Sequence, residues 1–403
     1  MHCKSMLKKI FFFIVSKVTL LLDYLIPKNE ILIVFSQRNG NFNDNSKALF
    51  EYMMNKQGEF GNLRLVWLTD KKEVAEESSL FCNAYSIRGY WLALRAKTFI
   101  ISHGLGETLY SKYFSKRKNN IVVWHGTPIK PSGMLNKNLT IEEKTAHIHE
   151  ETSKYLLFLC SSKMDAISAA ACHHLSNDRI MITGLPRNDV LFNPPEIDSL
   201  VGVSGSIKSI LDKKIILYAP TFRDSEATQF FPFQDHDPAS LADFLIDQDA
   251  YLLIRPHKND EANQQRISAL ISDFGGRFVL ADNREVIDVA AILPYVNTIV
   301  TDYSSIYIDL LLVDCPCVFI PYDLEEYERT RGILYDYSLV TPGPKVSTEK
   351  DFKDSLYDGL NGGLSYELER KRVCDLFHAY QDNKSSERVT QRILSVIRHK
   401  SVF

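Results

Sequence analysis

The chain has 403 residues, of which 45% are hydrophobic and 24% charged, as is usual for a folded globular protein. This length exceeds one ordinary hydrophobic core and indicates two domains of similar size. The net charge of -3 excludes an overall electrostatic attraction to nucleic acid, so an anionic substrate must be held by local positive groups.

The first 28 residues are predicted to form an amphipathic helix. Residues 7–26 are apolar, but Lys17 and Asp23 interrupt them, which argues against a membrane-spanning helix. In a helix, one narrow face would carry the polar residues Lys9, Ser16, Thr19 and Asp23. The opposite face would carry Phe11, Ile14, Val18, Leu21 and Leu25. This pattern favours a helix that lies in the membrane interface. The alternative is a helix packed on its own domain or on a partner subunit.

Short aliphatic runs alternate with helix-like stretches along most of the chain. Such runs, when helices separate them, are typical of parallel strands buried on both faces. In the first half the predicted strands are 31–36, 63–68, 98–102, 121–124, 156–160 and 179–182. In the second half they are 215–219, 251–254, 277–280, 298–301 and 317–321.

A stretch rich in proline and glycine, 193–214, is predicted to link two domains. The predicted fold is therefore α/β, with two doubly wound parallel-sheet domains facing a cleft. The expected divisions are the N-terminal helix over 1–28, the two α/β domains over 29–200 and 210–380, and a C-terminal helix over 381–403. Ligands in such folds bind at the carboxyl ends of the strands, so the loops there carry the candidate site.

The first candidate is His125, which follows the predicted strand 121–124 and precedes Gly126, Thr127 and Lys130. A histidine at a strand end can take a proton from an attacking hydroxyl near neutral pH. The following glycine lets a ligand approach the backbone closely. The alternative is a structural histidine.

Two further strand ends carry groups suited to phosphate. Strand 251–254 leads into Arg255, His257 and Lys258, a density of positive charge that fits an anion or, alternatively, a solvated basic turn. Strand 298–301 ends at Thr301, and Ser304 and Ser305 then open a predicted helix, whose free N–H groups favour phosphate. A simple N-cap is the alternative for one of these serines.

Other polar side chains at element ends are weaker candidates. Each can meet substrate or stabilise the fold by pairing with nearby acids; they are Arg187, Asn188, Arg223, Asp302 and Arg331. No clustered cysteines, histidines or carboxylates indicate a metal site, so neither a metal nor another cofactor is expected.

At these residues the sequence resembles the CDP-glycerol glycerophosphotransferase family, which includes teichoic-acid and capsule primases and polymerases. Six segments carry the resemblance in order: WHGTPIK (124–130), TGLPRNDVL (183–191), YAPTFRD (218–224), IRPHKND (254–260), TDYSSIYIDLL (301–311) and YDLEEYERTRGILYDY (322–337). The resemblance covers roughly residues 120–345 and is much weaker before residue 100.

The resemblance implies a GT-B-like fold, an acceptor-side N-terminal domain and a C-terminal domain that binds the CDP donor. It implies two essential histidines, His125 as general base for the acceptor hydroxyl and His257 on the donor phosphates. The remaining donor-phosphate or nucleotide candidates are Arg223, Arg255, Thr301, Ser304, Ser305 and Arg331. The acceptor-side or loop candidates are Gly126, Thr127, Lys130, Arg187, Asn188 and Asp302.

The expected reaction is transfer of glycerol phosphate or another alditol phosphate from CDP-glycerol or CDP-ribitol to a polyprenyl-linked glycan acceptor, with release of CMP. The expected location is the cytoplasmic face of the bacterial membrane, with no nucleic-acid partner. The alternative is a GT-B glycosyltransferase that uses a nucleotide sugar.

Overall fold

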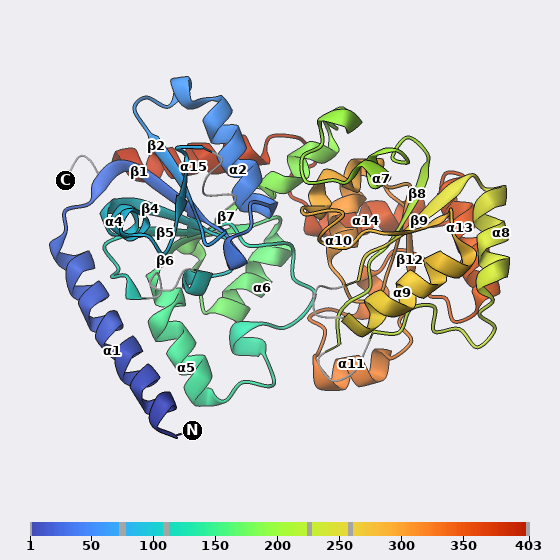
Figure 1. Ribbon diagram of the computed structural model, residues 1–403, viewed down its shortest axis with the longest axis horizontal. Coiled ribbons are helices and arrows are strands. Elements are labelled where there is room, and N and C mark those ends of the chain that lie inside the picture. The colour runs from blue at the N-terminus through green and yellow to red at the C-terminus, as the bar shows by residue number, and fades with distance from the viewer. Residues whose placement is uncertain (1, 72–77, 108–112, 224–227, 257–260, 400–403) are drawn as a thin grey trace. The chain divides into compact units, whose positions relative to one another are not determined.

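The computed structural model describes residues 2–71, 78–107, 113–223, 228–256 and 261–399 (Figure 1). The chain divides into two compact units. Unit 1 consists of Met1–His125, Ser132–Arg187 and Lys384–Phe403, and unit 2 of Gly126–Pro131 and Asn188–Asn383. The predicted fold class is confirmed, since each unit contains a parallel sheet with helices packed against it.

Unit 1 is built on a seven-stranded sheet in the order β3-β2-β1-β4-β5-β6-β7. Every neighbouring pair of these strands is parallel. The strands are β1 (Asn29–Ser36), β2 (Arg64–Thr69), β3 (Phe81–Asn83), β4 (Ala96–Ile101), β5 (Asn119–Val122), β6 (Tyr155–Cys160) and β7 (Ile180–Ile182). The short β3 was not predicted. Strand β5 ends two residues earlier than expected, and Trp124 has a left-handed backbone with φ of 50°.

Both faces of this sheet are buried because alternate residues of each strand point to opposite sides. In β1, Leu32 and Val34 belong to one hydrophobic cluster, whereas Ile33 and Phe35 belong to the other. The first cluster includes residues of α4 (Ile87–Arg95) and α6 (Lys163–His173). The second includes residues of α2 (Asp44–Asn55) and of the C-terminal helix α15 (Ser385–His399). The last helix of the chain therefore completes the core of unit 1. Helix α5 (Ile141–Glu150) also belongs to this unit.

The N-terminal helix α1 (His2–Leu25) is attached to unit 1 through its polar face. Asp23 is fully buried and pairs with Lys28 at 2.8 Å and with Lys118 at 3.2 Å. Lys118 Nζ also donates to the carbonyl oxygens of Ala93 and Ala96, at the end of α4. Burial alone would raise the pKa of Asp23, but Lys118 and Lys28 hold it below its ordinary value. A buried ion cluster therefore joins α1 to α4.

The apolar face of α1 points away from this attachment. Ile14, Val18, Leu21 and Leu25 are all exposed, whereas Thr19 is buried and hydrogen-bonded to Tyr90. The packing thus leaves the large apolar side chains in contact with solvent. Among the described residues, no helix has both the length and the apolar character needed to cross a membrane.

Unit 2 is built on a five-stranded parallel sheet in the order β10-β9-β8-β11-β12. Its strands are β8 (Lys214–Tyr218), β9 (Ala250–Ile254), β10 (Phe278–Leu280), β11 (Thr298–Thr301) and β12 (Cys317–Phe319). Its helices are α7 (Gly205–Lys208), α8 (Pro238–Asp247), α9 (Glu261–Phe274), α10 (Ile306–Leu310), α11 (Leu324–Thr330), α12 (Tyr337–Val340), α13 (Glu349–Leu360) and α14 (Glu367–Phe377).

The stretch 193–214, expected to be a linker, packs on unit 2. Ile207 is fully buried, and Val203 forms an isolated antiparallel bridge with Val286. Ser204 N donates to the carbonyl of Glu285 at 2.8 Å. That the ranges 29–200 and 210–380 are separate domains stays a prediction.

Replacing Asp23 with Asn is expected to lower the free energy of unfolding of unit 1 by about 3–5 kcal/mol, because two buried ammonium groups would lose their carboxylate. Urea unfolding followed by tryptophan fluorescence measures this directly, since Trp67, Trp91 and Trp124 all lie in unit 1. Because the pKa of Asp23 is lowered, its stabilisation is present at neutral pH and is lost as the pH falls through that lowered pKa.

The matched control is Glu59→Gln, which removes a carboxylate whose side chain is 62% exposed. That change should cost less than about 1 kcal/mol. An Asp23→Asn variant as stable as the control would contradict the role of the ion cluster.

Candidate active site

In both units the candidate residues follow the carboxyl ends of parallel strands, and each sheet has one point where strand order reverses. In unit 1 the reversal lies between β1 and β4, and in unit 2 between β8 and β11. Connections leave in opposite directions at such a point, so a crevice forms there and ligands bind in it. Ser36 is the last residue of β1, and the loops after β4, β8 and β11 contain Ser102, Arg223 and Asp302.

His125 lies in a ring cluster at this edge of unit 1. Its imidazole stacks on that of His103, with ring centres 3.9 Å apart and planes at 5°. The ring centre of the Trp124 indole lies 4.3 Å from that of the His125 imidazole. The Nδ1 atom of His125 is buried and has no hydrogen-bond partner among the described residues. This nitrogen is therefore an unsatisfied polar atom within the described part of the fold.

The His125 imidazole is held in its neutral form. Its pKa lies well below the ordinary value, first because the ring is withdrawn from water and then because His103 and Arg187 oppose another positive charge. A neutral imidazole can accept a proton at physiological pH, which a general base must do.

The loop that carries His125 is fixed by Arg187 and Asn45. Arg187 Nη1 donates to the His125 carbonyl at 2.8 Å and pairs with Asp44 at 3.0 Å. Asn45 Nδ2 donates to the carbonyls of Val123 and Trp124, both at 3.2 Å. The structure therefore brings the predicted residues His125 and Arg187 together, with Arg187 hydrogen-bonded to the backbone of His125.

Glu107 is a buried carboxyl beside this cluster that the sequence analysis missed. It accepts hydrogen bonds from the backbone N–H of Ser102 at 2.7 Å, from that of His103, and from the Ser36 hydroxyl at 2.8 Å. The Ser102 hydroxyl lies 2.6 Å from His103 Nδ1. Burial raises the pKa of Glu107 to about 7, although these donors oppose the shift. Glu107 thus ties the ends of β1 and β4 together and orients the ring that stacks on His125. No sequence signal pairs residues 36 and 107.

In unit 2, Arg223 is bound by two aspartates across the point where strand order reverses. Its Nε atom lies 2.8 Å from Asp323, and its Nη1 atom lies 2.8 Å from Asp302. Burial alone would lower the pKa of Arg223, but these two carboxylates raise it above its ordinary value. The rings of Tyr303 and Tyr322 each lie 5.0 Å from the guanidinium carbon. Its role towards donor phosphate stays a prediction.

Two more donor-side candidates make hydrogen bonds within the fold. Arg255 donates to the carbonyls of Ala281 at 2.8 Å and Val286 at 3.1 Å. Burial lowers the pKa of Arg255 to about 10. The Thr301 hydroxyl donates to the Ala219 carbonyl at 2.8 Å. Both side chains therefore fix loops at the carboxyl edge of the sheet.

Ser304 and Ser305, predicted to open a helix, directly precede α10, which begins at Ile306. Both residues are half-buried, and Ser305 is the N-cap but makes no side-chain capping hydrogen bond. A simple capping role therefore does not account for the Ser305 hydroxyl.

The remaining candidates are distributed as follows. Gly126 has a φ of 138°, which only glycine adopts readily, and Thr127 and Lys130 follow it in the segment of unit 2 that begins there. Asn188 donates to Asp309 at 3.0 Å, also within unit 2. Arg331 follows α11 and is half-buried. His257 lies outside the described residues. Among the described residues, no group of three or more His, Cys, Asp or Glu side chains is placed to hold a metal ion.

Comparison with known proteins identifies relatives of this chain. The sequence profile of a family described as CDP-glycerol:poly(glycerophosphate) glycerophosphotransferase matches residues 18–395. A teichoic acid glycerol-phosphate transferase of Staphylococcus aureus is 27% identical, over 91% of this chain and 93% of the relative. A teichoic acid ribitol-phosphate primase of Bacillus spizizenii is 24% identical, over 94% of each.

The fold is similar to that of the wall teichoic acid polymerase TagF, with a TM-score of 0.76 and 23% identity over 98% of this chain and 96% of that one. A UDP-N-acetylglucosamine 2-epimerase from Neisseria meningitidis has a TM-score of 0.51 and 10% identity over 90% of this chain and 99% of that one. These likenesses concern the fold alone.

Glu107 is expected to make the stability of unit 1 depend on pH. A carboxyl whose folded pKa is raised from 4.5 to about 7 destabilises the fold as the pH rises through that interval, because the folded state then holds a proton that the unfolded state has lost. Between these two pH values the natural protein should lose about 3 kcal/mol more of unfolding free energy than Glu107→Gln.

Urea unfolding over this pH range, followed by tryptophan fluorescence of both proteins, measures the difference. Because the other titrating groups are common to both, parallel curves would contradict the account of Glu107.

Proposed function

The chain belongs to the CDP-glycerol:poly(glycerophosphate) glycerophosphotransferase family, and on this premise we propose that it transfers an alditol phosphate from a CDP-alditol to a hydroxyl of a lipid-linked glycan. The donor is CDP-glycerol or CDP-ribitol, and CMP is released. One relative named a glycerol-phosphate transferase and another named a ribitol-phosphate polymerase support a CDP-alditol donor. A variant of TagF has been soaked with CDPG, which favours CDP-glycerol over CDP-ribitol as the donor to test first.

The observation that carries the proposal is the neutral imidazole of His125 with a buried Nδ1 that has no partner among the described residues. A hydroxyl attacking phosphorus must lose its proton, and a positioned base contributes about 10²- to 10⁴-fold to such a step. His125 is the base in this proposal. Arg187 and Glu107 are positioning residues, because they act through the His125 backbone and through His103.

On the donor side we assign the pyrophosphate to the start of α10. The hydroxyls of Ser304 and Ser305 and the nearby backbone N–H groups would donate to phosphate oxygens. Thr301 and Arg223 act by shaping the loops, because each already makes hydrogen bonds within unit 2. By the family resemblance, His257, Arg255 and Arg331 add positive charge as negative charge accumulates on the leaving group.

The proposed reaction is a single in-line displacement. The acceptor oxygen forms a bond to the phosphorus that bears the alditol, and its proton passes to His125. The bond from that phosphorus to the bridging oxygen breaks, and its electron pair leaves with CMP. Positive side chains and oriented N–H groups supply the electrostatic stabilisation that such a transition state needs. We expect no metal requirement.

We further propose that the protein rests on the cytoplasmic face of the membrane through α1, where it meets a polyprenyl-linked acceptor. The support is the orientation of the helix: its polar face is bound to unit 1, and Ile14, Val18, Leu21 and Leu25 are exposed. Exposed aliphatic side chains in a row on one helix face are the surface that an interfacial helix buries in lipid.

His125→Ala is expected to lower the rate of acceptor-dependent CMP release by about 10²- to 10⁴-fold, because the proton acceptor is removed. The assay supplies CDP-glycerol or CDP-ribitol with lipid-linked disaccharide acceptors, so the donor that turns over also identifies the alditol.

The matched control is His149→Ala, at an exposed position of α5 in the same unit, which should keep the natural rate. Near-natural turnover by a folded His125→Ala protein would refute the base assignment. Failure with both donors together with turnover of a UDP- or GDP-sugar would instead favour a glycosyltransferase.

Replacing Val18 and Leu21 together with Gln should weaken partitioning onto lipid vesicles by about 30-fold, because apolar area is no longer buried in the interface. These point changes are preferable to deleting α1, since deletion would remove Asp23 from its two lysines. The control replaces Leu364 and Leu368, exposed at 73% and 80% in unit 2. Equal binding by the two double variants, measured by co-sedimentation, would argue against a membrane role for α1.

A further inference from the structure

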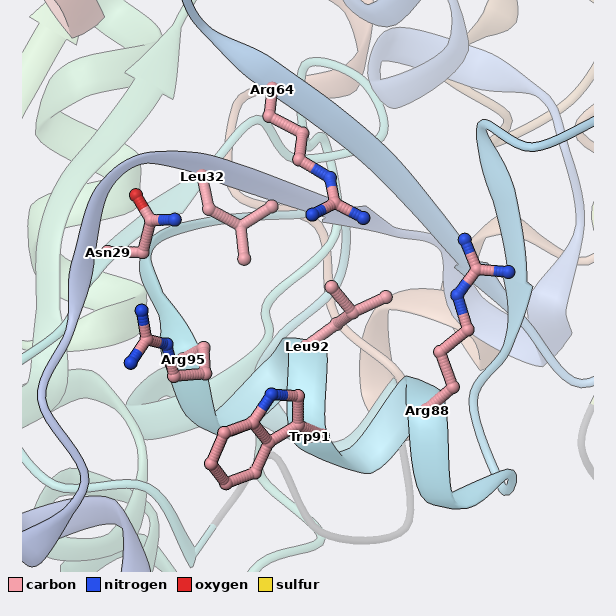
Figure 2. A pocket seen from close by; sticks show the side chains of 7 residues that line it. All are labelled: Asn29, Leu32, Arg64, Arg88, Trp91, Leu92 and Arg95. Atoms are coloured by element: carbon pink, nitrogen blue, oxygen red, sulfur yellow. The ribbon is translucent and has the colours of Figure 1, made fainter.

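An arginine-lined cavity lies at the edge of unit 1 opposite the candidate active site. Its volume is about 300 Å³, and Arg64, Arg88, Arg95 and Trp91 surround a floor formed by Leu32 and Leu92. Figure 2 shows Arg64 extending from β2 towards α4, whose Arg88 and Arg95 lie on either side of Leu92. We call this the arginine pocket.

The three guanidinium groups have no carboxylate partner among the described residues, unlike the half-buried Arg187 and the buried Arg223. Arg64 and Arg88 are exposed and Arg95 is half-buried, so solvent screens the repulsion between these like charges, but no carboxylate among the described residues offsets it. An anion in the cavity would offset it. Guanidinium forks match the oxygen atoms of phosphate particularly well.

The position of the arginine pocket separates it from the reaction. Asn29 and Arg64 are the first residues of β1 and β2, and Leu32 is paired in register with Arg64. Ser36, which binds Glu107, is the last residue of β1. A strand of this length spans roughly 23 Å, so the pocket is at the amino-terminal edge of the sheet and the His125 cluster is at the carboxyl edge.

Helix α4 connects the arginine pocket to the exposed apolar face of α1. Ile87, at the start of α4, is 92% exposed, and Trp91, one turn later, is 52% exposed. Ile87 also lines an apolar groove of about 440 Å³ together with Ile14 and Val18 of α1. Ile87, Trp91 and Arg95 follow one another at intervals of four residues along α4, so the surface along this row changes from aliphatic to indole to guanidinium, and Arg88 lies next to Ile87. Lipid presents the matching order, from acyl chain to interface to phosphate.

We propose that the arginine pocket binds the phosphate headgroup of an anionic phospholipid in the leaflet on which α1 lies. This inference rests on the membrane attachment proposed above and is independent of the transfer reaction. It assigns α4 a part in membrane binding and makes attachment depend on lipid charge. A soluble phosphate compound shares the headgroup chemistry, but the adjoining Ile87 and Trp91 favour lipid.

The test replaces Arg64, Arg88 and Arg95 with Gln in the full chain and compares binding to phosphatidylcholine vesicles with and without phosphatidylglycerol. The control replaces Lys213, Lys350 and Lys371, exposed in unit 2, with Gln, so that net charge changes equally. We expect the pocket variant to lose roughly a hundredfold of its partitioning onto the anionic vesicles, and the control less than fivefold. Both should bind neutral vesicles as the natural protein does.

Trp91 reports where the lipid lies. The fluorescence of Trp91 is obtained as the difference between the natural protein and Trp91→Phe. We expect phosphatidylglycerol with brominated acyl chains to quench this fluorescence strongly. The quenching should disappear in the variant that lacks Arg64, Arg88 and Arg95. Inorganic phosphate should not reverse it. Equal partitioning of the pocket and control variants would overturn the proposal. Reversal by inorganic phosphate would also overturn it and assign the cavity to a soluble anion. CMP release, measured separately, distinguishes either result from a failure of the transferase assignment.

Discussion

Every strand of a parallel sheet delivers its following residues to the same edge, and in each unit of this protein the chemistry depends on that constraint. Strand order reverses between β1 and β4 in unit 1 and between β8 and β11 in unit 2. At the first reversal Glu107 joins the two strand ends, and at the second Arg223 and Asp302 do so. These two connections differ in chemistry. Glu107 is a single carboxyl that accepts hydrogen bonds from neutral donors, whereas Arg223 and Asp302 form a buried ion pair. Both fix loops whose neighbouring residues are the candidates for catalysis.

The units handle buried charge in two ways, and the difference fits the roles proposed for them. His125 is withdrawn from water next to other cationic groups, so it is neutral and can take up a proton. In unit 2, Arg223 keeps its charge because Asp302 and Asp323 compensate it. The same compensation joins α1 to unit 1, where Asp23 meets two lysines. An isolated charge in any of these places would cost several kcal/mol, so each is neutral or paired.

The sequence predicts the sheets well because strands buried on both faces read as continuous aliphatic runs. It misses β3, which is only three residues long and ends in Asn83, and it extends β5 through Trp124, whose backbone is left-handed. His125 and Arg187, predicted separately as candidates, are joined by a hydrogen bond that the sequence does not predict. Glu107 could not be found, because Ser36 and Ser102 reach it from separate strands. Amphipathicity identifies the two faces of α1, but which face packs inward is decided by Lys28 and by the distant Lys118.

The central claim is that His125 acts as a base in one displacement at phosphorus and not as a nucleophile. The stereochemical course of the reaction tests it most directly. With a CDP-alditol made chiral by a sulfur atom at the transferred phosphorus, a single in-line attack by the acceptor hydroxyl inverts the configuration, and the account predicts inversion. Retention would require two displacements through a covalent enzyme intermediate and would contradict the account.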